Sequence, residues 1–174
     1  MQPLIFLDID GVLNSHHSNY ELYQPYIKNL KTLVDATDAQ IILSSSWQMF
    51  VKKENNEIVP KNKNTHGHAL VDALAKENLK IFDKVVDDDI LPSNKRHKEI
   101  LNYLRKRFNY EINYPNFVIL DDDDFGFNSE LTLKGHHVKT FAGEYNFIPD
   151  DAQGFNTTKL TEALYIMKSL IHYT

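Results

Sequence analysis

The chain has 174 residues, which suffice for one well-filled core and are few for two domains, so we expect a single domain over residues 1–174. A net charge of −5 at pH 7 argues against indiscriminate binding to polyanions, and the lack of cysteine excludes disulfides, thiolate metal sites and cysteine nucleophiles. The apolar stretch at residues 4–7 is too short for a signal peptide or a membrane span. We therefore expect a cytoplasmic protein without membrane contact.

Apolar runs that stop at polar or turn-forming residues predict five strands. They begin at residues 4, 39, 81, 116 and 138, and end at residues 7, 43, 86, 120 and 141. Helical spacing predicts helices over 25–34, from a cap at Ser93 or Asn94 to about 108, and from 157 to about 172. Residues 48–80 are expected to begin and end as helix, with an exposed, charged and Asn-rich loop between. This alternation favours an α/β fold with a doubly wound, Rossmann-like, mainly parallel sheet.

The first predicted strand ends in two carboxylates, Asp8 and Asp10, followed by Gly11. Open α/β sheets place their ligand sites at the carboxyl ends of the strands. Two carboxylates this close are stable only with a compensating cation, and a divalent metal ion is the simplest one. The alternative is a solvated turn, which the complete string through Asn14 makes the weaker interpretation.

Other predicted strand ends carry complementary polar groups. Hydroxyl groups at Ser44–Ser46 follow the second strand, the carboxylates of residues 121–124 follow the fourth, and the helix before the fourth strand begins at Lys95 and Arg96. Parallel strands would bring these groups to one edge of the sheet. Each group also has a simpler interpretation, namely a helix cap for the serines and solvated positions for the charged residues.

The order of these motifs resembles the haloacid dehalogenase (HAD) superfamily of phosphatases and phosphotransferases. The resemblance covers essentially the whole chain and is most specific in the string from Phe6 to Asn14. The strings at 43–47 and 119–123, and the spacing of Arg96, Ile100 and Leu104, look like the HAD domain of bacterial Swiss Army Knife RNA-repair proteins. A HAD-like fold with little or no cap domain is therefore expected.

The resemblance implies a role for each motif residue. Asp8 would be the nucleophile that forms an aspartyl-phosphate, and Asp10 the general acid and then the general base. Ser44 would bind a phosphoryl oxygen and Arg96 would stabilise the transition-state charge, with Ser45 and Lys95 as the respective alternatives. Further substrate contacts are expected from Gly11 and Asn14. Mg²⁺ would be held by an oxygen-only set, a carboxylate oxygen of Asp8, the main-chain carbonyl of Asp10, and Asp121 or Asp122.

The expected function is a Mg²⁺-dependent phosphomonoesterase with a phosphorylated substrate. Because little sequence is left for a cap, the site would be open enough for a nucleic-acid end with a 3'- or 5'-phosphate, or a nucleotide. The acidic net charge keeps a small sugar or metabolite phosphate as the alternative substrate. A second alternative is a regulatory domain that binds Mg²⁺ or phosphate without catalysis, and the acid at position 10 argues for catalysis instead.

Overall fold

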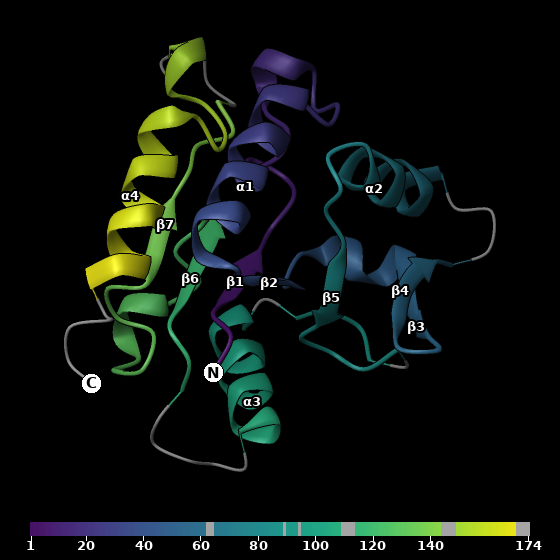
Figure 1. Cartoon of the computed structure of the whole chain (residues 1–174), viewed down its shortest axis with the longest axis vertical. Helices are drawn as coiled ribbons and strands as arrows, with labels where there is room; N and C mark the ends of the chain where they lie inside the picture. Colours follow the sequence, from purple (N-terminus) through teal and green to yellow (C-terminus); the bar gives the residue numbers. More distant parts are fainter. Residues whose placement is uncertain (62–64, 89, 94, 109–113, 144–148, 170–174) are drawn as a thin grey trace.

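A computed structural model describes residues 1–61, 65–88, 90–93, 95–108, 114–143 and 149–169 of the chain. Its central sheet is parallel, with the strand order β5-β2-β1-β6-β7 (Figure 1). The strands of this sheet are β1 (Leu4–Leu7), β2 (Gln40–Leu43), β5 (Ile81–Lys84), β6 (Phe117–Asp121) and β7 (His137–Lys139). The helices are α1 (Gln24–Thr37), α2 (Thr65–Ala75), α3 (Arg96–Arg107) and α4 (Thr157–Ser169). The predicted α/β fold is thus confirmed.

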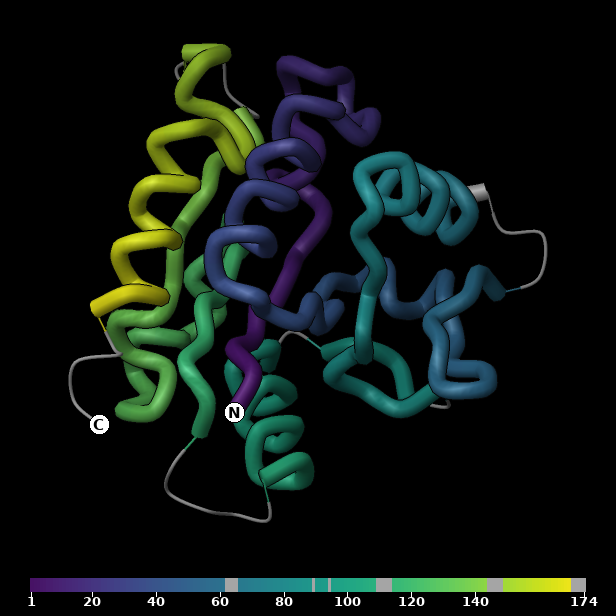
Figure 2. Tube along the Cα trace, in the orientation of Figure 1, coloured from purple at the N-terminus to yellow at the C-terminus, as the bar shows by residue number. Residues whose placement is uncertain are grey.

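Helices cover both faces of the sheet, as the tube in Figure 2 shows. On one face α1, α2 and α4 pack against the side chains of residues such as Leu7, Leu43 and Leu120. On the other face α3 packs against Phe6, Ile42, Ile119 and their neighbours. Alternation along each strand separates the two sets, since successive side chains point to opposite faces.

The same alternation directs the acidic residues towards α3. Phe6 and Ile119 face α3 and are register partners in adjacent strands. Two residues further along each strand stand Asp8 and Asp121, so both carboxylates lie on that face. Arg96 is the first residue of α3 and is buried below the same two strand ends. The lysine before it, Lys95, occupies the N-cap position without a side-chain cap bond.

The prediction for residues 48–80 was wrong in its first half. After a short 3-10 helix at Ser46–Phe50, residues Val51–Glu54 (β3) and Glu57–Pro60 (β4) form an antiparallel hairpin. Asn55 and Asn56 both have positive φ angles, 51° and 65°, as the tight turns of two-residue hairpins require. The helical half of the prediction is met by α2, and residues 62–64 of the expected loop lie outside the described residues.

Two smaller differences concern helix ends. The cap expected from Ser93 acts from outside the helix, where its hydroxyl accepts a bond from the Lys95 amide at 3.2 Å. Asn94, the other expected cap, and residues 170–172 of the last predicted helix lie outside the described residues. Over the described part of the chain, every helix is too short or too polar to cross a membrane.

The hairpin contributes Ile58 to the core, and substitution of this residue tests the contribution. Its side chain is 8 % exposed and belongs to the larger of the two apolar clusters. Ile58→Ala should lower the free energy of unfolding by about 2–4 kcal/mol in urea denaturation. Glu57→Ala, at an exposed position of the same strand, should change it by roughly 0.5 kcal/mol or less. Equal small effects of both substitutions would contradict the hairpin packing.

Candidate active site

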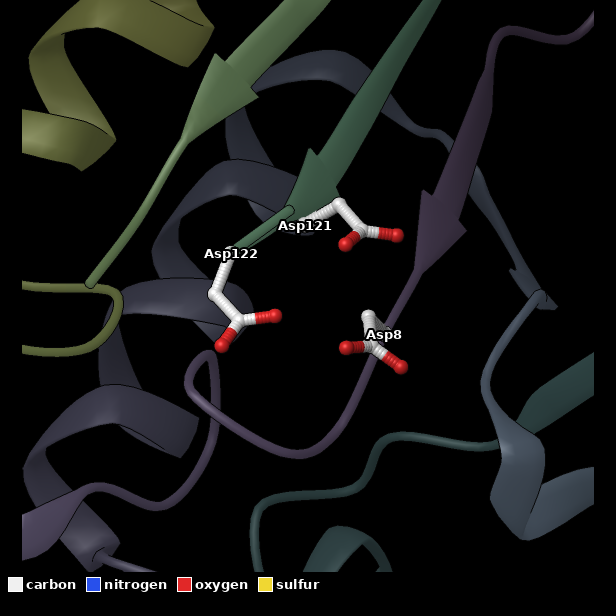
Figure 3. Close-up of side chains that lie close together, drawn as sticks. All are labelled: Asp8, Asp121 and Asp122. Atoms are coloured by element: carbon white, nitrogen blue, oxygen red, sulfur yellow. The ribbon is translucent and has the colours of Figure 1, made fainter. Parts of the chain in front are cut away.

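Three carboxylates converge where β1 and β6 end (Figure 3). Asp8, Asp121 and Asp122 each offer an oxygen atom within 4.8 Å of the others. Asp8 and Asp121 are almost completely buried, whereas Asp122 is half-buried. Three acidic groups at this distance repel one another strongly unless cations are close by. The arrangement therefore needs an explanation beyond packing.

Arg96 supplies part of the compensating charge. Its Nη1 atom lies 3.1 Å from Asp8 Oδ1 and donates a hydrogen bond of 2.5 Å to Asp121 Oδ2. The guanidinium carbon stands 4.4 Å from the centre of the Phe125 ring, so an aromatic face covers the cation. Burial lowers the pKa of Arg96, but the carboxylates of Asp8 and Asp121 outweigh this effect and raise the pKa above its usual value.

One arginine does not balance three acids. Burial raises the pKa of Asp8, against the lowering effect of Arg96. Burial and the charge of Asp8 raise the pKa of Asp121 to about 8 and that of Asp122 to about 6. Burial and mutual repulsion therefore disfavour the fully ionised cluster, and a bound cation would stabilise it. Its donor set consists of oxygen atoms only, which fits a hard divalent cation such as Mg²⁺.

The turn after β1 sets the approach of Asp122 to Asp8. Gly11 has a φ of +71°, and a Cβ atom there would stand 2.4 Å from Asp122 Oδ2. The side chain of Asn14 holds the turn, because its Oδ1 accepts a 2.9 Å hydrogen bond from the Gly11 amide. These two residues shape the loop that carries Asp10. Neither of them lines the depression over the carboxylates, so the substrate contacts expected of them stay a prediction.

Asp10 lies apart from the carboxylate cluster. Its residue is exposed, and each of its oxygens accepts a hydrogen bond of 2.9 Å, Oδ1 from Asn14 Nδ2 and Oδ2 from Trp47 Nε1. The side chain faces the same depression as Asp8. Only its main-chain carbonyl was expected to bind metal, and within the described residues the carboxylate cluster does not include its side chain.

The three serines after β2 have three different environments. Ser44 is fully buried, its Oγ has no hydrogen-bond partner among the described residues, and it does not line the depression. Ser45 is also buried, and its hydroxyl accepts from the Trp47 amide and bonds to Asp8. Ser46 lines the depression. The geometry therefore favours Ser45 and Ser46 over Ser44 for contacts at the reacting centre.

Lys95 is not brought to the site. It is exposed and lines a separate depression, together with Leu91, Lys98 and Glu99. Of Lys95 and Arg96, the two basic residues expected to stabilise the transition-state charge, Arg96 is the one that reaches the carboxylates. Arg96 is the first residue of α3, whereas Lys95 is the N-cap residue before it. This placement argues against a Lys95 contact with substrate bound at Asp8.

The depression over the carboxylates has a volume of about 500 Å³. Its walls include three residues absent from the sequence prediction, Phe125 after β6, and Lys139 and Phe141 at the end of β7. A signal for the last two existed, because the end of any parallel strand beside β6 falls at the same edge of the sheet. The acidic centre is thus flanked by a cation and two aromatic rings.

Two adjacent histidines at the start of β7, His136 before the strand and His137 within it, have structural partners. His136 bonds to the carbonyl of Phe117 and stacks on its ring, and His137 bonds to the carbonyl of Asp121. Burial lowers the pKa of both imidazoles, which keeps them neutral. Neither belongs to the carboxylate cluster found among the described residues.

Comparison with known proteins identifies the family. Residues 4–145 match the family model described as the HAD domain in Swiss Army Knife RNA repair proteins. No curated protein and no solved structure shows a significant match to the chain. The matched segment begins with β1 and includes Asp8, Arg96 and the acidic end of β6. The chain belongs to the family of HAD domains found in Swiss Army Knife RNA repair proteins.

Proposed function

We propose that this protein is a metal-dependent phosphomonoesterase that uses Asp8 as its nucleophile. Membership of the HAD family indicates a phosphatase of HAD type in general. The observation that supports the specific mechanism is the placement of Asp8, Asp10 and Arg96 around one depression. A binding domain would need the charges, but it would not need a second, separately held acid facing the same space.

In the first half-reaction a carboxylate oxygen of Asp8 attacks the phosphorus atom of the substrate. The bond from phosphorus to the leaving oxygen breaks, and Asp10 donates its proton to that oxygen. In the second half-reaction Asp10 removes a proton from water, whose oxygen attacks the aspartyl-phosphate. The bond from phosphorus to Asp8 then breaks, which releases inorganic phosphate and restores both carboxyl groups.

Two further features support phosphoryl transfer. Arg96 contacts Asp8 through Nη1, so its charge would lie where negative charge grows on the phosphoryl oxygens. Ser46 lines the depression and can donate a hydrogen bond to a phosphoryl oxygen, while Ser45 orients Asp8. Ser44, the residue expected for this contact, is buried behind them.

The proposed metal is Mg²⁺. Asp8, Asp121 and Asp122 would hold it, with the main-chain carbonyl of Asp10 as a further ligand. When bound, Mg²⁺ neutralises charge on the phosphoryl group and on the nucleophile, so that the two anions can approach. The support is the oxygen-only donor set and the deficit of positive charge around it.

For the substrate we propose a phosphate at the end of a nucleic acid. The support is the family, whose HAD domains occur in RNA repair proteins, together with the depression of about 500 Å³ that is lined by Lys139, Phe125 and Phe141. Aromatic rings can stack on a base, and a lysine can pair with a neighbouring phosphate. A small sugar or metabolite phosphate would use the acidic centre without these groups.

Asp8→Asn removes the nucleophile and should abolish Mg²⁺-dependent release of phosphate. The loss expected is at least about 1,000-fold in kcat, because an amide cannot form the acyl-phosphate. Asp72→Asn, which changes an exposed carboxylate on α2, is the matched control and should keep full activity. Circular dichroism of both variants verifies the fold. Unchanged release by a folded Asp8→Asn protein would refute the mechanism.

The metal can be tested without any substrate. The folded pKa of Asp122 is about 6, above the unfolded value, so its contribution to stability is lost as the pH rises from about 4 to about 7. In EDTA, Asp122→Asn should therefore become more stable than the wild type across this window, by on the order of 2 kcal/mol. Saturating Mg²⁺ should reverse the order at pH 7, because only the wild type keeps all three ligands. Urea denaturation measures the free energy of unfolding of both proteins with EDTA and with Mg²⁺. If Asp122→Asn stays the more stable protein in Mg²⁺, the result argues against the metal site.

The substrate class can be tested with a panel of phosphate esters. It contains oligonucleotides with a 3'- or a 5'-phosphate, mononucleotides and sugar phosphates. We expect the highest kcat/KM for an oligonucleotide, and Lys139→Ala should raise KM for it about 10-fold while changing KM for a sugar phosphate less. A sugar phosphate as the best substrate, with Lys139 irrelevant, would favour the small-molecule alternative.

A further inference from the structure

Asp10 is exposed, yet both oxygens of its carboxylate accept hydrogen bonds. Asn14 Nδ2 donates to Oδ1 and Trp47 Nε1 donates to Oδ2, each at 2.9 Å. Asn14 lies on the same turn as Asp10, whereas Trp47 comes from the segment after β2. An exposed aspartate with free rotamers would point its carboxylate in several directions. Two donors from different sides leave it one orientation towards the depression.

Trp47 is itself fixed in place, which makes it a rigid donor. It is 9 % exposed, and its amide donates to the hydroxyl of Ser45 at the start of the 3-10 helix. Its ring packs edge-on against Phe50 and His66, with centroids 6.0 Å and 5.2 Å away. The indole therefore has little freedom to follow a moving carboxylate.

Packing alone does not account for a tryptophan at this position. A phenylalanine would keep an aromatic ring beside Phe50 and beside His66 of α2, but it would lack the N–H group. The indole N–H is the group of the Trp47 side chain that donates a hydrogen bond to Asp10. Its partner is the acid that has to face the leaving oxygen.

We infer that Trp47 is a positioning residue, which holds the Asp10 carboxyl in the orientation needed for proton transfer to and from the substrate. This inference rests on the proposed function, in which Asp10 is the general acid and base. Misplacing a catalytic group by about 1 Å can cost on the order of 100-fold in rate. The hydrogen bond from Trp47 Nε1 to Asp10 Oδ2 would prevent such a displacement.

The test compares two substrates that differ in their need for an acid. The leaving group of p-nitrophenyl phosphate is a stabilised phenolate, which departs without a proton. The leaving group of an alkyl phosphate is an alkoxide, which needs a proton from a general acid. The value of kcat/KM reports the first phosphoryl transfer. Trp47→Phe should lower kcat/KM by about 10-fold to 100-fold for the best alkyl substrate of the panel and by much less for p-nitrophenyl phosphate. In an Asp10→Asn background it should add no further loss.

Phe50→Leu is the matched control, because it disturbs the same aromatic cluster and leaves the Asp10 bond intact. Phe50→Leu should change kcat/KM by the same factor for both substrates. An equal loss for both substrates in Trp47→Phe would overturn the inference while leaving the phosphatase in place. Wild-type protein without Asp8-dependent release would overturn the proposed function and this inference with it.

A second measurement keeps the inference testable if Trp47→Phe folds poorly. Trp47 is the only tryptophan of the chain, so the intrinsic fluorescence comes from this indole alone. Asp10→Ala removes the acceptor of its N–H bond and should shift the emission maximum, while Asp72→Asn should not. Identical emission of the wild type and Asp10→Ala would overturn the inference.

Discussion

Arg96 Nη1 lies between the carboxylates of Asp8 and Asp121, and this buried bridge makes the site and the core interdependent. Removing charged groups from water is costly, and the cost is met only when partners are placed accurately. Here the partners come from two strand ends and the first residue of α3. A shift of that helix would therefore leave buried charges without their partners, so the packing of α3 and the chemistry of the site are linked.

The bridge also explains why an acidic centre can exist in a well-packed protein. Arg96 neutralises part of the charge of Asp8 and Asp121, and its guanidinium carbon lies 4.4 Å from the centre of the Phe125 ring. The remaining negative charge, with Asp122 added, is what a divalent cation would match. Structure and proposed catalysis thus use the same residues, with Arg96 serving both.

Much of the fold was predictable because hydrophobic alternation and βα order are strong signals in a short parallel sheet. The same alternation carried Asp8 and Asp121 to one face, so their proximity followed from strand register alone. The hairpin at β3 and β4 was missed because its strands are short and rich in charge. The pair Asn55 and Asn56, both with positive φ, was the overlooked turn signal.

Individual side-chain contacts were less predictable than elements. Three successive serines follow β2, and whether Ser44 or Ser45 reaches Asp8 depends on where the strand stops, which periodicity leaves open by a residue or two. The choice between Lys95 and Arg96 depended in the same way on the first turn of α3. Lys139, Phe125 and Phe141 were missed because the short strand β7 and the loop after β6 give weak patterns.

The position of β1 in the middle of the sheet has a consequence for synthesis on the ribosome. Its partner β2 follows early in the chain, but the strand on its other side, β6, is made much later. Until then one edge of β1 lacks its hydrogen-bond partner, and Asp8 lacks both Arg96 and Asp121. Long-range pairing of this kind is slow and favours late assembly. A nascent chain therefore acquires its acidic centre only after nearly the whole sheet has been translated, so a chain that ends before β6 lacks the complete carboxylate cluster.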